Sequence, residues 1–138
     1  MFVRQRQRMN MNFTEEQKLT AWNKATVVPG FDPHTFRKDA CGAWMVWDKY
    51  GTSDNIYGWE IDYVIPPCIL EHKGFSEQDI NESENLRALQ FLNKFSKGED
   101  YPSYTSVVTS RGDKNVEEMH NLTVNAKLRA KLEKLYGL

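Results

Sequence analysis

The order of elements expected across residues 57–98 is the feature that most constrains the fold of this chain. A β-favouring run over 57–65 predicts a strand, which ends because the two prolines after it cannot continue a strand. A long polar connection then leads to a second short strand and a short helix that stops at Gly98. The expected bounds are a connection over 68–84, a strand over 85–89 and a helix over 90–97. Two strands followed by a helix form a ββα unit.

A capping box opens the first expected helix. The Thr14 hydroxyl and the Gln17 amide have the spacing at which each bonds the other residue's backbone, which predicts a helix over 14–25. The residues expected to face inward are Leu19, Trp22 and Val27.

Other segments complete the expected element order. Asp32-Pro33 is a helix-start signal and predicts a turn or two of helix through Arg37. The apolar run 43–47 predicts a short strand, and 101–109 is expected to be extended. The segment 125–136 predicts a closing amphipathic helix, with Gly137 as its C-cap. The residues that share its apolar face are Leu128, Leu132, Leu135 and Tyr136.

Length and composition fit one packed domain. The chain has 138 residues, of which 40% are hydrophobic and 12% aromatic. We expect residues 1–13 to form an N-terminal arm, basic or merely frayed, and 14–138 to form a single domain. Because 18 Lys and Arg face 19 Asp and Glu, the whole surface is not basic, and any contact with nucleic acid requires a local patch.

Cysteine usage and hydropathy favour a cytoplasmic protein. Cys41 and Cys68 lie far apart and form no CxxC zinc pair; we expect two reduced, buried thiols, with a disulfide as the alternative. No apolar run approaches the roughly 20 residues of a membrane span, and the arginines near the start are not followed by the apolar stretch of a secretory signal. No membrane partner is therefore expected.

Five short segments together resemble one branch of the HNH endonuclease family. They are RKDACGA at 37–43, YG at 50–51, GWEID at 58–62, NLRAL at 85–89 and KG at 97–98. That branch reads RKDACGA, YG, GWEIDH, NLRPL and a closing Asn-x-x-Lys. Each piece alone is weak, but the combination spans most of the chain. The resemblance implies an α+β fold with a ββα-metal core, a short antiparallel hairpin plus a helix, flanked by N- and C-terminal helices.

The resemblance also implies a site. In the family the Asp of the Asp-His pair binds a divalent metal such as Mg²⁺, and the adjacent His is the general base that activates water. An Asn at the start of the second strand holds the hairpin, and a His or Asn nine residues later is another metal ligand. Matched residue by residue, Asp62 falls on the metal-binding Asp and Asn85 on the structural Asn.

Two catalytic positions depart from the family pattern. The general-base position is Tyr63, and a phenol with an ordinary pKa of about 10 is a poor base at neutral pH. The helix ligand position is Lys94, whose ammonium group would be repelled by a dication at about 4 Å with about 8 kcal/mol at an effective dielectric of 20. We expect Lys94 to pair with Asp62 instead of a metal, which predicts an inactive site that needs no cofactor.

Replacements for the lost groups are few. His72 in the long connection is a candidate substitute base, although a loop histidine without supporting spacing is more often only solvated. Glu60 and Asp62 share a strand face and form a weak candidate metal pair. The favoured alternative for that pair is a salt bridge with Lys94 or Arg87.

Two groups of residues suggest binding surfaces. Four aromatic residues form either a base-stacking surface or, preferably, part of the core: Trp44, Trp47, Tyr57 and Trp59. Five basic residues form either a local patch for DNA or RNA phosphates or a solvated face: Arg37, Lys38, Arg87, Lys94 and Lys97.

Three functions follow as hypotheses. The first is an inactive HNH-like protein that binds nucleic acid, a nucleotide or a protein partner. The second is an active endonuclease, dependent on Mg²⁺ or another divalent metal, with a relocated base. The third is a phage or mobile-element regulatory protein that acts on a host protein.

Overall fold

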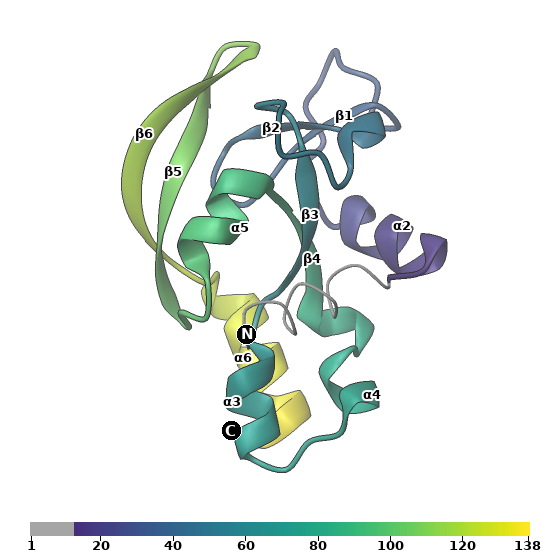
Figure 1. Cartoon of the computed structure of the whole chain (residues 1–138), viewed down its shortest axis with the longest axis vertical. Helices are drawn as coiled ribbons and strands as arrows, with labels where there is room; N and C mark the ends of the chain where they lie inside the picture. Colours follow the sequence, from purple (N-terminus) through teal and green to yellow (C-terminus); the bar gives the residue numbers. More distant parts are fainter. Residues whose placement is uncertain (1–12) are drawn as a thin grey trace.

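The computed structural model describes residues 13–138 and confirms an α+β fold (Figure 1). The expected N-terminal arm falls almost entirely outside these residues. The described helices are α2 (Glu15–Asn23), α3 (Pro67–His72), α4 (Glu77–Ile80), α5 (Phe91–Lys97) and α6 (Ala126–Tyr136). The strands are β1 (Phe36–Lys38), β2 (Trp44–Val46), β3 (Trp59–Tyr63), β4 (Leu86–Gln90), β5 (Ser103–Arg111) and β6 (Lys114–Thr123). Within this part of the chain they form three two-stranded antiparallel sheets, β1–β2, β3–β4 and β5–β6.

The central sheet and its helix have the element order expected from the sequence. β3 and β4 pair antiparallel, with Asp62 opposite Arg87, and α5 follows β4 directly. The Gln90 side chain caps α5 by accepting hydrogen bonds from the first turn, and Gly98 ends the helix at a positive φ of 53°. A strand pair closed by a helix therefore occupies the middle of the molecule (Figure 1).

The connection between β3 and β4 is not the open loop that its composition suggested. It contains α3 and α4. Pro67 stands in the first turn of α3, where a proline costs no hydrogen bond, and Ser76 forms a capping box with Asp79 at the start of α4. Helices of six and four residues are too short to establish an apolar period, so the sequence pattern missed them.

The first helix has the expected cap but not the expected buried face. The Gln17 backbone N–H donates to the Thr14 hydroxyl at 3.1 Å, and the Thr14 N–H donates to the Gln17 side chain at 2.8 Å. Trp22 is buried, whereas Leu19 and Val27 are about half exposed. Leu19 was wrongly placed because Ala21 and Trp22 are the residues through which this short helix contacts the core, and Val27 because it lies beyond the helix.

The helix-start signal at Asp32-Pro33 does not open a helix. The Asp32 carboxylate accepts hydrogen bonds from the His34 N–H at 3.0 Å and the Thr35 hydroxyl at 3.3 Å, which makes a turn that leads into β1. Asp stabilises such local turns as readily as it caps helices, so the signal was misread.

The β5–β6 hairpin was only half expected. β5 overlaps the extended segment 101–109, but β6 is rich in charged and amide residues and was not foreseen. One side of this hairpin packs on α5, and Asn93 of α5 fixes the contact. The Asn93 side chain accepts hydrogen bonds from the backbone N–H groups of Val107 and Val108 at 2.8 and 2.9 Å and donates to the Val108 carbonyl at 2.9 Å.

The closing helix packs on the core through part of its expected face. Leu132 and Tyr136 are buried and Leu128 is half-buried, but Leu135 is 46% exposed. Leu135 was wrongly placed because it lies at the edge of this apolar stripe, beside the line of Leu128, Leu132 and Tyr136 that packs on the core. Gly137 caps the helix in the left-handed region, at a φ of 66°, as expected.

Both cysteines are free thiols, but only one of them is buried. Cys41 lies in the core, whereas Cys68 on α3 is exposed, which corrects the expectation of two buried thiols. Within residues 13–138, no helix combines the length and apolar character that a membrane crossing requires.

We predict that Asn93→Ala destabilises the fold by about 3 kcal/mol or more, because it leaves several buried backbone groups without partners. Urea unfolding followed by circular dichroism measures this loss. Asn121→Ala is the matched control, since Asn121 bonds only the exposed Thr105 hydroxyl across the same hairpin, and it should cost no more than about 0.5 kcal/mol. Equal losses in the two variants would contradict the anchoring role of Asn93.

Candidate functional site

A buried charge cluster lies where β3, β4 and α5 meet. Arg87 Nε donates to Asp62 Oδ2 at 3.1 Å, and Lys97 Nζ lies 3.5 Å from Asp62 Oδ1. Lys97 Nζ also donates to the Tyr63 carbonyl oxygen at 3.0 Å. The exposed fractions of Asp62, Arg87 and Lys97 are only 3%, 8% and 1%. Both oxygens of the Asp62 carboxylate therefore face a positively charged group inside the protein.

The three charges of this cluster depend on one another. Burial lowers the pKa of Lys97, and the neighbouring Asp62 carboxylate acts in the opposite direction. Burial is the largest single cause acting on Arg87 and lowers its pKa, but Asp62, together with Tyr104 and Cys41, raises that pKa overall. Removing the single carboxylate would leave two buried cations without a counter-charge, which is costly in a medium of low polarity.

Lys94 does not occupy the place expected for it. Its Nζ lies 4.0 Å from Glu60 Oε1, and Arg87 and Lys97 are the residues that face Asp62. Glu60 and Asp62 share one face of β3, but Glu60 faces Lys94 and Asp62 faces Arg87 and Lys97, so the pair forms salt bridges, the favoured alternative to a metal pair. The expectation that Lys94 pairs with Asp62 is therefore wrong. Lys97, about one helical turn later on α5, is the lysine that reaches Asp62.

Tyr63, at the general-base position, is held as a structural side chain. Its hydroxyl donates to Asn81 Oδ1 at 2.7 Å, and its ring packs against Phe13 at a centroid distance of 5.6 Å. Burial is the main cause that raises the pKa of Tyr63. A phenol that resists ionisation and already donates its proton to an amide is not suited to activating water at neutral pH.

Asn85 ties together the ends of the connection between the strands. Its Oδ1 accepts the Ile65 N–H at 2.8 Å, and its Nδ2 donates to the Ile65 and Ile80 carbonyls, both at 3.1 Å. The side chain is fully buried. Every polar atom of this amide is thus used to hold the backbone on either side of α3 and α4.

His72, the candidate substitute base, lies far from this cluster along the fold. It is the exposed last residue of α3, and α3 extends away from the end of β3 (Figure 1). A six-residue helix is about 9 Å long, which places His72 too far for a direct hydrogen bond to a group held at Asp62.

The five candidate basic residues do not form one exposed patch. Arg87 and Lys97 are buried beside Asp62. The Arg37 guanidinium donates to three backbone carbonyl oxygens near α2, and the Lys38 ammonium lies 4.9 Å from the centre of the Trp44 ring. Lys94 is mostly buried and faces Glu60. These basic side chains are therefore mostly engaged in contacts within the chain.

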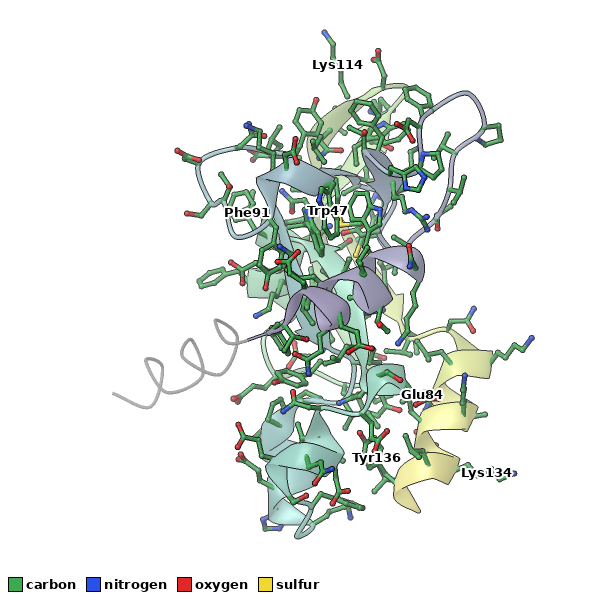
Figure 2. All side chains as sticks on the ribbon, turned by 90° about the vertical axis from the view of Figure 1, so that its right-hand side faces the viewer. Trp47, Glu84, Phe91, Lys114, Lys134 and Tyr136 are labelled. Atoms are coloured by element: carbon green, nitrogen blue, oxygen red, sulfur yellow. The ribbon has the colours of Figure 1, made fainter. Side chains whose placement is uncertain are left out.

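The candidate stacking aromatics pack mainly inside the molecule. Trp59 is fully buried, and its ring lies 5.0 Å from Trp22 and 5.6 Å from Trp47. Trp44 is also buried, whereas Tyr57 and Trp47 are partly exposed. Figure 2 shows Trp47 among the side chains that cover the upper part of the molecule. These positions agree with the preferred interpretation, in which the aromatics belong to the core.

Asp39 is a buried polar residue whose role the sequence alone did not single out. Its Oδ1 accepts the Cys41 and Ala43 N–H groups, both at 2.9 Å. Its Oδ2 accepts the Gln90 N–H at 3.0 Å and Asn93 Nδ2 at 3.1 Å. Burial raises the pKa of Asp39, and these four donors oppose the shift. The sequence feature that could have indicated a role for Asp39 is its position within the RKDACGA segment.

Across residues 13–138, no cluster of three or more His, Cys, Asp or Glu side chains is arranged to hold a metal ion. The carboxylates that the sequence offered for this purpose, Glu60 and Asp62, both face lysine or arginine side chains.

No protein-family model, curated protein or solved structure matches this chain. Its function is therefore inferred from its own residues and geometry.

We predict that Asp62→Asn destabilises the protein by about 3–5 kcal/mol, because it leaves two buried cations without their carboxylate. Glu60→Gln is the matched control on the same strand face. Glu60 is one-third exposed and lies 4.0 Å from its lysine, so its loss should cost no more than about 1 kcal/mol. Chemical unfolding of both variants measures the difference, and a mild Asp62→Asn phenotype would contradict a closed charge cluster.

We also predict that alkaline unfolding coincides with tyrosine ionisation. Burial is the main cause that raises five tyrosine pKa values above the ordinary value of 10, to about 12 for all but Tyr63, so the stability that these phenols contribute is complete below pH 10 and is lost as pH rises through the raised values. Tyrosinate absorbance and circular dichroism, followed together, test this. Ionisation of these groups near pH 10 in a protein that stays folded would contradict it. The five residues are Tyr50, Tyr63, Tyr101, Tyr104 and Tyr136.

Proposed function

We propose that this chain is an HNH-like protein with a ββα-metal-type core that has lost nuclease catalysis and acts by binding a partner. The sequence resemblance supports the core, and the order β3, β4, α5 agrees with it. Loss of catalysis is supported by the residues at the positions where the family places a base and two metal ligands.

One observation carries the loss of catalysis: the Tyr63 hydroxyl, at the position of the family's general base, already donates to Asn81 Oδ1 at 2.7 Å. The Asp62 carboxylate, which is buried with a cation at each oxygen, adds to it. A divalent metal needs carboxylate oxygens that are free to coordinate it, and a cation nearby repels it. Binding a metal here would require at least one of the two side chains to move away from a buried carboxylate.

Arg87 and Lys97 are part of the family pattern, so the departures that matter most are Tyr63 and Lys94. Tyr63 has its hydroxyl engaged by Asn81. Lys94 supplies a further positive charge on the same helix as Lys97. Tyr63 does not supply the general base, and Lys94 does not supply the metal ligand, that the family has at these positions. A change in the Asp62 cluster alone would therefore not restore a base.

We predict that the purified protein does not nick supercoiled plasmid in Mg²⁺, Mn²⁺ or Ni²⁺. The reason is that the base is missing and that repulsion weakens metal binding. Agarose electrophoresis over a range of protein concentrations measures nicking, with a parallel preparation of Tyr63→Phe as the control for contaminating nuclease. Nicking that requires metal and disappears in a folded Asp62→Asn variant would overturn the proposal in favour of an active endonuclease with a relocated base.

The reverse experiment restores both groups. Tyr63→His combined with Lys94→Asn is expected to gain Mn²⁺ binding and metal-dependent nicking, whereas each single variant should gain neither in full. Calorimetric titration with Mn²⁺ and the plasmid assay measure the two properties separately. A folded double variant with no metal affinity would count against an HNH-like origin of this core.

The positions of the basic residues bear on the kind of partner. Because Arg87 and Lys97 are buried and the Arg37 guanidinium is bonded to backbone carbonyls, the patch suggested for DNA or RNA phosphates is not assembled. This disfavours the backbone of a nucleic acid as a ligand of these five residues and leaves a nucleotide or a protein partner as the better-supported choices.

A further inference from the structure

A cavity of about 640 Å³ lies along the side of β4, where α2, α6 and the end of β6 meet. Its volume falls within the range of small-molecule sites. Much of its wall is apolar, with Val64, Leu86 and Leu128 among the lining residues, and its charged residues come from four different elements. Glu84 lies at this side of the molecule, next to α6 (Figure 2).

Arg87 is the residue that gives this cavity its chemistry. It lines the wall, and it is more than nine-tenths buried. Its Nε donates to Asp62, but its Nη2 is buried and has no hydrogen-bond partner. Across the described chain, it is the one buried side-chain nitrogen or oxygen in that condition. Buried donors of this kind normally have a partner, and Arg87 is the cavity-lining residue whose guanidinium has a nitrogen without one.

Most of the charged residues around the cavity have the same sign as Arg87. Lys24 and Lys131 also line it, against the single carboxylate of Glu84. Lys24 is itself partly buried, with its ammonium group donating to the carbonyls of Ser83 and Leu86. Three cations against one anion in a partly apolar hollow favour a negatively charged occupant.

We infer that this cavity binds a small organic anion, whose carboxylate or phosphate pairs with the Arg87 guanidinium and is attracted by Lys24 and Lys131. The planar guanidinium matches the two oxygens of either group. The apolar lining and the volume fit a hydrophobic or aromatic body attached to that group, which free inorganic phosphate lacks. This site is separate from the missing catalytic groups at Tyr63 and Lys94, so it does not depend on whether the protein cuts DNA.

Four probes test the inference on the full chain: benzoate, phenyl phosphate, inorganic phosphate and the neutral benzamide. We expect benzoate or phenyl phosphate to bind with a dissociation constant on the order of 1 mM or tighter, and benzamide to bind at least tenfold more weakly. Titrations followed by amide chemical shifts measure the affinities. In the same spectra the Arg87 Nε–H signal should move with the bound anion.

Variants locate the site without disturbing the Asp62 cluster. Leu122→Trp places a larger ring in the cavity wall and should abolish binding, while Met119→Trp, on the exposed side of the same strand, should leave it unchanged. Lys131→Ala should weaken binding by about threefold, as expected for an exposed charge. Lys127→Ala, one turn earlier on α6, is its control.

The outcomes separate the alternatives. Equal binding of benzamide and benzoate would overturn the inference by showing an apolar cavity without anion selectivity. Binding that survives Leu122→Trp, or an Arg87 signal that does not move, would overturn it by placing the anion elsewhere. Absence of binding by all four probes would also overturn it. None of these results changes the plasmid-nicking result, so failure here is distinguishable from failure of the proposed loss of catalysis.

Discussion

The pairing of Asp62 with Arg87 and Lys97 is the interaction on which the centre of this molecule depends. It joins one residue from each of β3, β4 and α5, and all three are buried. Ion pairs in an interior contribute little net stability compared with apolar packing, but they tolerate few alternative arrangements. This cluster therefore fixes how the helix lies on the strand pair. The same contacts that order the core leave neither oxygen of the Asp62 carboxylate without a neighbouring cation.

Two buried asparagine side chains connect this central cluster to the segments around it. Asn85 closes the connection between the strands, and Asn93 joins α5 to β5 and to the carboxylate of Asp39. Each of these side chains bonds backbone N–H or C=O groups at points where regular pairing supplies no backbone partner. The molecule consequently holds three small sheets together with side-chain hydrogen bonds, where a larger protein would use one continuous sheet.

The sequence predicted the central unit well, because strands 59–63 and 86–90 combine β-favouring or apolar residues with clear stops and the helix after them ends at Gly98. It failed where short segments obey local capping rules, as in α3 and α4, and at Asp32, where a turn and a helix start share the same residue. For the candidate site, the sequence identified Asp62 and Asn85, but it assigned the wrong lysine to Asp62. One helical turn separates the two lysines, and the packing of α5 on β3, β4 and β5 decides which of them reaches Asp62. Asp39 was overlooked because a buried carboxylate held by backbone N–H groups leaves no period in the sequence.

The β5–β6 ribbon has a register shift between Ser106 and Val108. Asn93 takes the N–H groups of Val107 and Val108 at this point, so β5 has a substitute partner just where its pairing is irregular. A bulge increases the local twist of a ribbon, and a twisted, charged outer strand is a poor template for another chain. β6 carries Glu117 and Glu118 beside the irregularity. The irregular pairing at which Asn93 bonds the hairpin to α5 thus also makes this long two-stranded ribbon less able to pair with strands of neighbouring molecules.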